Sequence, residues 1–154
     1  GVVSDHKGIN VPDVNLSMPY ISDADMADLE FGAKMGFDYI AASFVRTGAD
    51  VIYLRKFTQS LGWFNPRIIA KIENAQGVAN IDEILDAADG IMVARGDMGV
   101  EIPFEQIPAI QKELIRKAYK CRQECYHSNS DAGVYDNKRT SYKSRDNRRC
   151  KRYL

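Results

Sequence analysis

Apolar residues follow two different spacings along the chain, and each spacing predicts one kind of secondary structure. Compact apolar runs at residues 37–44, 67–73 and 90–95 are typical of buried β-strands. Elsewhere an apolar residue recurs every three or four positions, which predicts helices. The predicted helices span residues 23–35, 49–61, 81–88 and 104–120. The chain therefore alternates between strands and helices.

Polar and glycine residues mark several of the predicted helix boundaries. Ser22 and Asn80 directly precede two helices and are expected to cap them, while Gly62 is expected to end another. Residues 7–19 are polar and interrupted by proline, which predicts an extended loop.

Alternating strands and helices indicate an α/β fold with parallel strands. The pattern fits either a (β/α)₈ barrel or an open doubly wound sheet. About three βα units are visible, whereas a barrel needs roughly 200 residues or more. We therefore interpret the 154-residue chain as a fragment of a larger fold.

The formal net charge of zero conceals a change in composition near Cys121. Residues 122–154 contain nine of the 21 basic residues and four of the 21 acidic ones, and their only aliphatic side chains larger than Ala are Val134 and Leu154. Such a segment buries too little apolar surface to offset its ordering entropy, so we expect it to be disordered. We expect no membrane association, because no apolar run approaches the ~20 residues that cross a bilayer.

Polar residues cluster where two predicted strands end. Lys71 and Glu73 lie on one side of the second strand, and Gly96 and Asp97 follow the third. The carboxyl ends of parallel strands form the active-site face of such folds. Two carboxylates suit Mg²⁺, and a glycine-rich turn can bind an anion through its backbone amides, so the cluster suits phosphoryl transfer. The alternatives are a surface ion pair between Lys71 and Glu73 and a purely structural tight turn at 96–99.

Several segments in one register resemble the pyruvate kinase family. The central one is IIAKIENAQGV at residues 68–78, which matches the family signature with its lysine and glutamate. The other matching segments are KGINVP (7–12), ASFVR (42–46), NIDEIL (80–85) and MVARGDMGVE (92–101). The resemblance covers residues 7–121.

This resemblance implies a partial TIM (β/α)₈ barrel and phosphoryl transfer from phosphoenolpyruvate to ADP, giving pyruvate and ATP in glycolysis. Lys71 resembles the catalytic lysine that stabilises charge on the transferring phosphoryl group and the enolate. Glu73 and Asp97 resemble the ligands of Mg²⁺ or Mn²⁺, and the amides of Gly96 and Asp97 resemble those that hold the substrate carboxylate. Lys7 resembles a nucleotide-phosphate contact.

The resemblance also predicts the organisation of the chain. Residues 1–18 would be the C-terminal end of a lid domain, residues 19–121 part of the barrel, and residues 122–154 the basic tail. The ligands of K⁺, which the family usually requires, would lie outside this chain. The full-length protein is expected to be a cytoplasmic homotetramer, and the chain by itself is expected to be inactive.

The family's next strand, Gly-Lys-x-Val-Ile-Thr-Ala-Thr-Gln-Met-Leu, is missing after Cys121. Codons for residues 122–130 can be chosen so that reading from the second base yields that strand. Our hypothesis is a one-base insertion near the codons of Cys121 and Arg122, which would make residues 122–154 an out-of-frame translation.

Three alternative interpretations stay open. The basic residues and tyrosines of the tail could bind nucleic acid in a non-catalytic remnant, although we do not expect this. Cys121, Cys125, His127 and Cys150 have a loose spacing for a zinc site. An aldolase or lyase of the phosphoenolpyruvate/pyruvate barrel superfamily could share the pair of carboxylates, but not the full set of motifs.

Overall fold

The computed structural model describes residues 19–128. It contains four strands: β1 (Tyr39–Ala42), β2 (Arg67–Ile72), β3 (Gly90–Ala94) and β4 (Glu124–Ser128). The α-helices are α1 (Asp23–Met35), α2 (Gly48–Ser60), α3 (Ala75–Ala79), α4 (Ile81–Ala87), α5 (Arg95–Met98) and α6 (Ile107–Lys120), and a 3₁₀ turn spans Phe104–Gln106.

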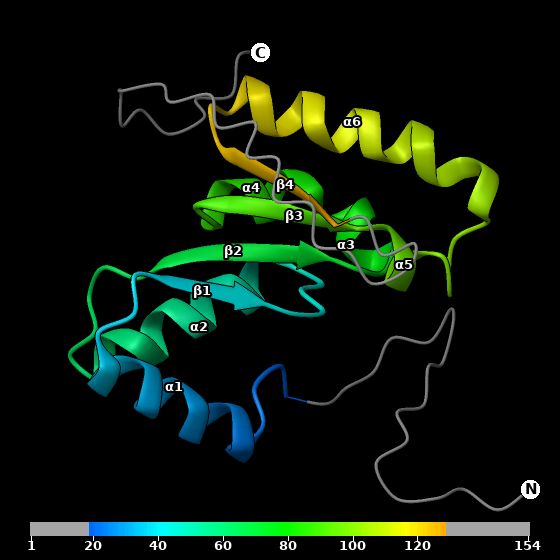
Figure 1. Ribbon diagram of the computed structural model, residues 1–154. Coiled ribbons are helices and arrows are strands. Elements are labelled where there is room, and N and C mark those ends of the chain that lie inside the picture. Colours follow the sequence, from blue (N-terminus) through cyan, green and yellow to red (C-terminus); the bar gives the residue numbers. More distant parts are fainter. Residues whose placement is uncertain (1–18, 129–154) are drawn as a thin grey trace, which may run out of the picture.

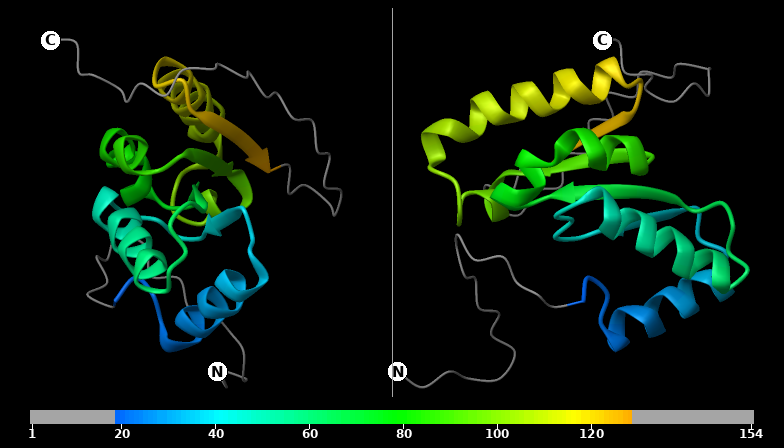
Figure 2. Two further views of the ribbon diagram at one scale, coloured as in Figure 1. Left: turned by 90° about the vertical axis from the view of Figure 1, so that its left-hand side faces the viewer. Right: turned by 180° about the vertical axis from the view of Figure 1, so that it is seen from behind.

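The four strands form one parallel sheet in the order β1-β2-β3-β4, which confirms the α/β prediction (Figure 1). Helices α2 and α4 lie behind the sheet in Figure 1 and in front of it in the reverse view of Figure 2. Neighbouring strands are thus joined through helices on one face, as in a barrel wall. Within the described residues, none of the helices is long and apolar enough to cross a membrane.

The core lies between the sheet and its helices. Strand residues that face the helices are fully buried, among them Ile68, Ile72 and Val93. The predicted apolar stripe of the last helix is confirmed, because Ile107 and Leu114 are buried in the same core. On the other face of the sheet, Lys71 and Met92 are only half-buried and Tyr39 is 45% exposed.

Side-chain caps explain where the first two helices begin. Ser22 and Asp25 form a reciprocal capping box at the start of α1, as the sequence predicts for Ser22, and Gly36 ends that helix with a φ of 68°. Thr47 and Asp50 cap α2 in the same way. Asn80 occupies the predicted N-cap position of α4, but its side chain makes no capping hydrogen bond and instead donates to the carbonyl of Arg46 at 3.0 Å.

The structure differs from the predicted elements in four places besides β4. The first apolar run forms a strand only over Tyr39–Ala42, because the chain turns at Ser43 and Phe44. Helix α3 was not predicted, and residues expected as a turn before a helix form α5 themselves. The helix predicted from residue 104 begins with a 3₁₀ turn.

The prediction that residues 122–154 lack structure is wrong for β4. Glu124–Ser128 pairs in parallel with β3, at the position where a further barrel strand would lie. Gly90 permits this pairing, since a Cβ there would lie 2.8 Å from the carbonyl oxygen of Glu124. Cys125 packs against the core, and Arg67 forms an ion pair with Glu124 at 3.2 Å. The rest of the basic tail, with its proposed nucleic-acid contacts, lies outside the described residues.

Candidate functional site

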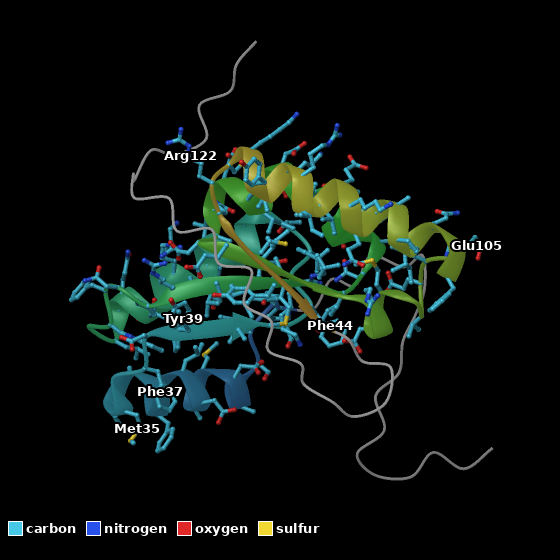
Figure 3. All side chains as sticks on the ribbon, turned by 45° about the horizontal axis from the view of Figure 1, so that its top comes forward. Met35, Phe37, Tyr39, Phe44, Glu105 and Arg122 are labelled. Atoms are coloured by element: carbon cyan, nitrogen blue, oxygen red, sulfur yellow. The ribbon has the colours of Figure 1, made fainter. Side chains whose placement is uncertain are left out.

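The candidate site lies at the carboxyl edge of the sheet, where α3 and α5 follow β2 and β3 (Figure 1). Figure 3 shows Phe44 beyond the carboxyl end of β1, with Tyr39 at the opposite end of that strand. Glu73 directly follows Ile72, which pairs with Val93 of β3. The parallel register therefore brings the ends of three neighbouring strands to one edge.

Lys71 and Glu73 form an ion pair at this edge. The Lys71 ammonium lies 2.5 Å from Oε1 of Glu73 and donates a second hydrogen bond to Oγ of Ser43 at 2.9 Å. The Glu73 side chain is only 1% exposed, whereas that of Lys71 is 24% exposed. The pair is therefore no surface ion pair, because its carboxylate is buried.

The other oxygen of Glu73 is held by the backbone of the β1 turn. The amide of Phe44 donates to Oε2 of Glu73 at 2.7 Å. Phe44 has a φ of 52°, a left-handed conformation that is uncommon for a bulky residue and costs of order 1–3 kcal/mol. The residue that donates this hydrogen bond to Glu73 is thus the one in the left-handed conformation.

Tyr20 anchors the same turn from the segment before α1. Its hydroxyl donates to the carbonyl oxygen of Ser43 at 2.9 Å. Burial raises the pKa of Tyr20, with further contributions from the carboxylates of Asp50 and Glu73, so the phenol retains the proton it donates. Tyr20 therefore ties the Ser43–Phe44 turn to the chain that enters the barrel unit.

The signature segment continues into a tightly packed helix start. Oδ1 of Asn74 accepts from the amide of Gly77 at 2.6 Å and caps α3. A Cβ at Gly77 would lie 2.6 Å from the carbonyl oxygen of Val45, so this position accepts no side chain without movement. Glu101 accepts from the amide of Ala75 at 2.9 Å, which ties the start of α3 to the loop after α5.

Gly96 and Asp97 lie on α5, directly after β3. Both residues are exposed, in contrast to buried Glu73. They fall in the first turn of the helix, where backbone amides lack an intrahelical acceptor. The structure therefore places four of the five predicted site residues at one edge of the sheet, while Lys7 lies outside the described residues.

The donor set suits Mg²⁺ better than a metal held by protein ligands alone. Among residues 19–128, no three His, Cys, Asp or Glu side chains gather closely enough to bind a metal ion. The zinc alternative is not tested, because Cys150 lies outside the described residues. Mg²⁺ commonly binds through one or two carboxylates and completes its shell with water and phosphate oxygens. Glu73 and Asp97 fit this pattern, and Glu73 already faces a cationic group.

Sequence reasoning missed the residues that support the site. From the sequence alone, Ser43, Phe44 and Tyr20 receive no role at the site. The positive φ of Phe44 leaves no compositional signal, because glycine is the usual marker of such a turn. The sequence ASFVR at 42–46 marked this turn only through the family resemblance.

Comparisons with known proteins agree with the parallel α/β fold. A family model described as "Pyruvate kinase, barrel domain" matches residues 1–126. A pyruvate kinase of Geobacillus stearothermophilus is 56% identical over 117 residues, which cover 76% of this chain and 20% of that protein. One of Clostridium perfringens is 50% identical over 117 residues, 76% of this chain and 25% of that protein.

The chain thus spans a fifth to a quarter of the length of these relatives. The parallel sheet with its helices is part of a TIM-like barrel, as the resemblance implies. From the matched barrel domain and the level of identity, we conclude that this chain belongs to the pyruvate kinase family.

Proposed function

We propose that this chain is part of an enzyme that transfers the phosphoryl group of phosphoenolpyruvate to ADP. The bond between phosphorus and the enol oxygen breaks, a bond to the terminal oxygen of ADP forms, and the enolate takes a proton to become pyruvate. The observation that carries the proposal is the Lys71–Glu73 pair at the carboxyl edge of a sheet that belongs to the family's barrel domain.

The charge and the position of Lys71 support this proposal. Its ammonium is partly exposed at the strand ends and is oriented by Glu73 and Ser43. In the proposed mechanism it stabilises the negative charge on the transferring phosphoryl group and on the enolate oxygen. Ser43 and the amide of Phe44 do not react in this mechanism; they orient Lys71 and Glu73.

Glu73 and Asp97 are proposed to hold the divalent cation, Mg²⁺ or Mn²⁺, and the first-turn amides of α5 at Gly96 and Asp97 to bind the substrate carboxylate. When bound, the cation would neutralise phosphate charge and align the phosphoryl group. Lys7 is proposed to contact a phosphate of the nucleotide. We place the K⁺ ligands in parts of the enzyme outside this chain, and the whole enzyme in the cytoplasm as a homotetramer.

We expect no turnover by this chain alone. The described sheet has four strands, whereas a complete barrel has eight, and the strands beyond β1 and β4 would contribute further groups to the site. Formation of pyruvate from phosphoenolpyruvate and ADP by the purified chain, measured with a coupled lactate dehydrogenase assay, would refute this expectation.

A chimera tests the proposed activity itself. Residues 7–121 of this chain would replace the matching segment of the Geobacillus stearothermophilus pyruvate kinase, and ATP formation would be measured. The chimera is expected to be active, and Lys71→Met is expected to lower kcat by about 10³-fold or more. Lys117→Met is a matched control, because Lys117 is similarly exposed but pairs with Asp82 on the helical side. Unchanged kcat in Lys71→Met would contradict the proposed role.

A further inference from the structure

The ion pair between Lys71 and Glu73 also bears on how the site binds a metal, an inference that rests on the proposed function. We propose that the Lys71 ammonium occupies the cation position of Glu73 in the metal-free protein and leaves it when a divalent cation binds. Metal binding and the freeing of Lys71 for the phosphoryl group would then be one coupled event.

Each carboxylate oxygen of Glu73 already has one partner. Oε1 lies 2.5 Å from the Lys71 ammonium, and Oε2 accepts from the amide of Phe44 at 2.7 Å. With 1% of the side chain exposed, Glu73 has almost no contact with solvent. Lys71 is partly open to solvent, at 24% exposure, and Ser43 and Phe44 beside it are exposed, so a cation arriving from solvent meets the ammonium on Oε1 of Glu73.

The Lys71 ammonium and a divalent cation would compete for Oε1 of Glu73. A buried carboxylate requires a positive partner, and the ammonium supplies it in the metal-free protein. A divalent cation requires direct contact with the same carboxylate. Two cations at contact distance from one oxygen repel each other strongly in a poorly solvated site. The Phe44 amide is fixed by the backbone, whereas Lys71 is on a flexible side chain, so Lys71 is the group that moves.

Ser43 stabilises the metal-free arrangement. Its hydroxyl accepts from the Lys71 ammonium at 2.9 Å and is itself part of the turn anchored by Tyr20. Removing this hydroxyl leaves both charges in place but weakens the hold on Lys71. A Ser43 variant therefore separates displacement of Lys71 from a simple long-range effect of its charge.

The test measures Mn²⁺ binding to the full chain without substrate, by electron paramagnetic resonance of free Mn²⁺. Lys71→Met is expected to bind Mn²⁺ at least tenfold more tightly than wild type, which corresponds to about 1.4 kcal/mol. Ser43→Ala is expected to bind about two- to fivefold more tightly, against no change if only charge matters. Glu73→Gln is expected to lose binding, and Lys117→Met to bind as wild type.

A second readout needs no variant at Lys71. Acetylation of lysines in the wild-type chain, followed by mass spectrometry, reports how free each ammonium is. Mn²⁺ is expected to increase the labelling rate of Lys71 several-fold while that of Lys117 stays constant. Lys117 is a suitable internal reference, because its side chain is 27% exposed and pairs with a carboxylate at 2.9 Å.

The outcomes separate this inference from the proposed function. If the wild-type chain and the Lys71→Met variant both fail to bind Mn²⁺, the proposed metal site is wrong and this inference falls with it. If Mn²⁺ binds through Glu73 but the labelling of Lys71 does not change and Ser43→Ala binds as wild type, Lys71 is not displaced. That result would overturn the inference and leave the proposed metal site intact.

Discussion

Replacing Gly77 by alanine tests how tightly the signature segment is packed. The added Cβ would lie 2.6 Å from the carbonyl oxygen of Val45 and 3.3 Å from Oδ1 of Asn74. Ordinary contacts of this kind lie at 3.4–4 Å, so the backbone of α3 or of the β1 turn must shift. Either shift disturbs the cap that Asn74 makes with the amide of Gly77.

The expected cost follows from three opposing terms. Overpacking of a rigid contact costs about 1–3 kcal/mol, and weakening the Asn74 cap adds ~1 kcal/mol. The greater helix propensity of alanine returns at most about 1 kcal/mol. We therefore expect Gly77→Ala to lower the free energy of unfolding by about 2 kcal/mol, or the Tm by roughly 4–8 °C for a chain of this length.

Equilibrium unfolding in urea, followed by far-UV circular dichroism and by the fluorescence of Trp63, measures this difference. Gly99→Ala is the matched control, because a Cβ there meets its nearest atoms at 3.5 Å and Gly99 has a φ of −67°. The control is expected within about 0.5 kcal/mol of wild type. If Gly77→Ala is as stable as Gly99→Ala, the close approach of α3 to the Val45 carbonyl does not restrict this position.

Three further predictions concern caps, thiols and the core. Ser22→Ala is expected to lower the free energy of unfolding by ~1 kcal/mol at pH 7. The hydrogen bonds from Ser22 lower the pKa of Asp25 from its ordinary 3.8. This stabilisation is therefore present above pH 3.8 and declines as the pH falls below it. If urea titrations give the same difference in free energy of unfolding between Ser22→Ala and wild type from pH 7 to pH 2, this reasoning is contradicted. Burial raises the pKa of the Cys125 thiol to about 11. Iodoacetamide at pH 8 should therefore alkylate Cys125 at least about tenfold faster in urea than in the folded chain. Equal alkylation rates would show that β4 does not bury this thiol. Leu114→Ala is expected to cost about 2–5 kcal/mol, against less than ~0.5 kcal/mol for exposed Lys112→Ala, in the same urea titrations; similar values would place Leu114 outside the core.

Local patterns in the sequence determined most of the helical structure. Ser22 and the periodic residues after it predict α1 with the bounds observed, because a capping box and a terminal glycine are encoded within a few positions. The apolar runs that became β2 and β3 were equally clear, since their helix-facing residues are fully buried. The motif around Lys71 and Glu73 also indicated where the site lies.

The strand β4 illustrates what local composition could not predict. Its polar sequence and the basic segment after it favour disorder, yet Glu124–Ser128 pairs with β3. The pairing depends on Gly90, 34 positions earlier in the sequence, which leaves room for the backbone of Glu124. Edge pairing of this kind is a property of two strands together and is not visible in either one.

The sequence alone identified the family, the three main strand–helix units and the charged residues at their strand ends. How those charges are partnered depends on contacts between elements that lie far apart in the sequence. The contacts of Glu73 with Phe44, and of Tyr20 with Ser43, join residues 29 and 23 positions apart. Such contacts depend on the register of the parallel strands and on one left-handed turn, and neither hydrophobic periodicity nor residue spacing carries that information.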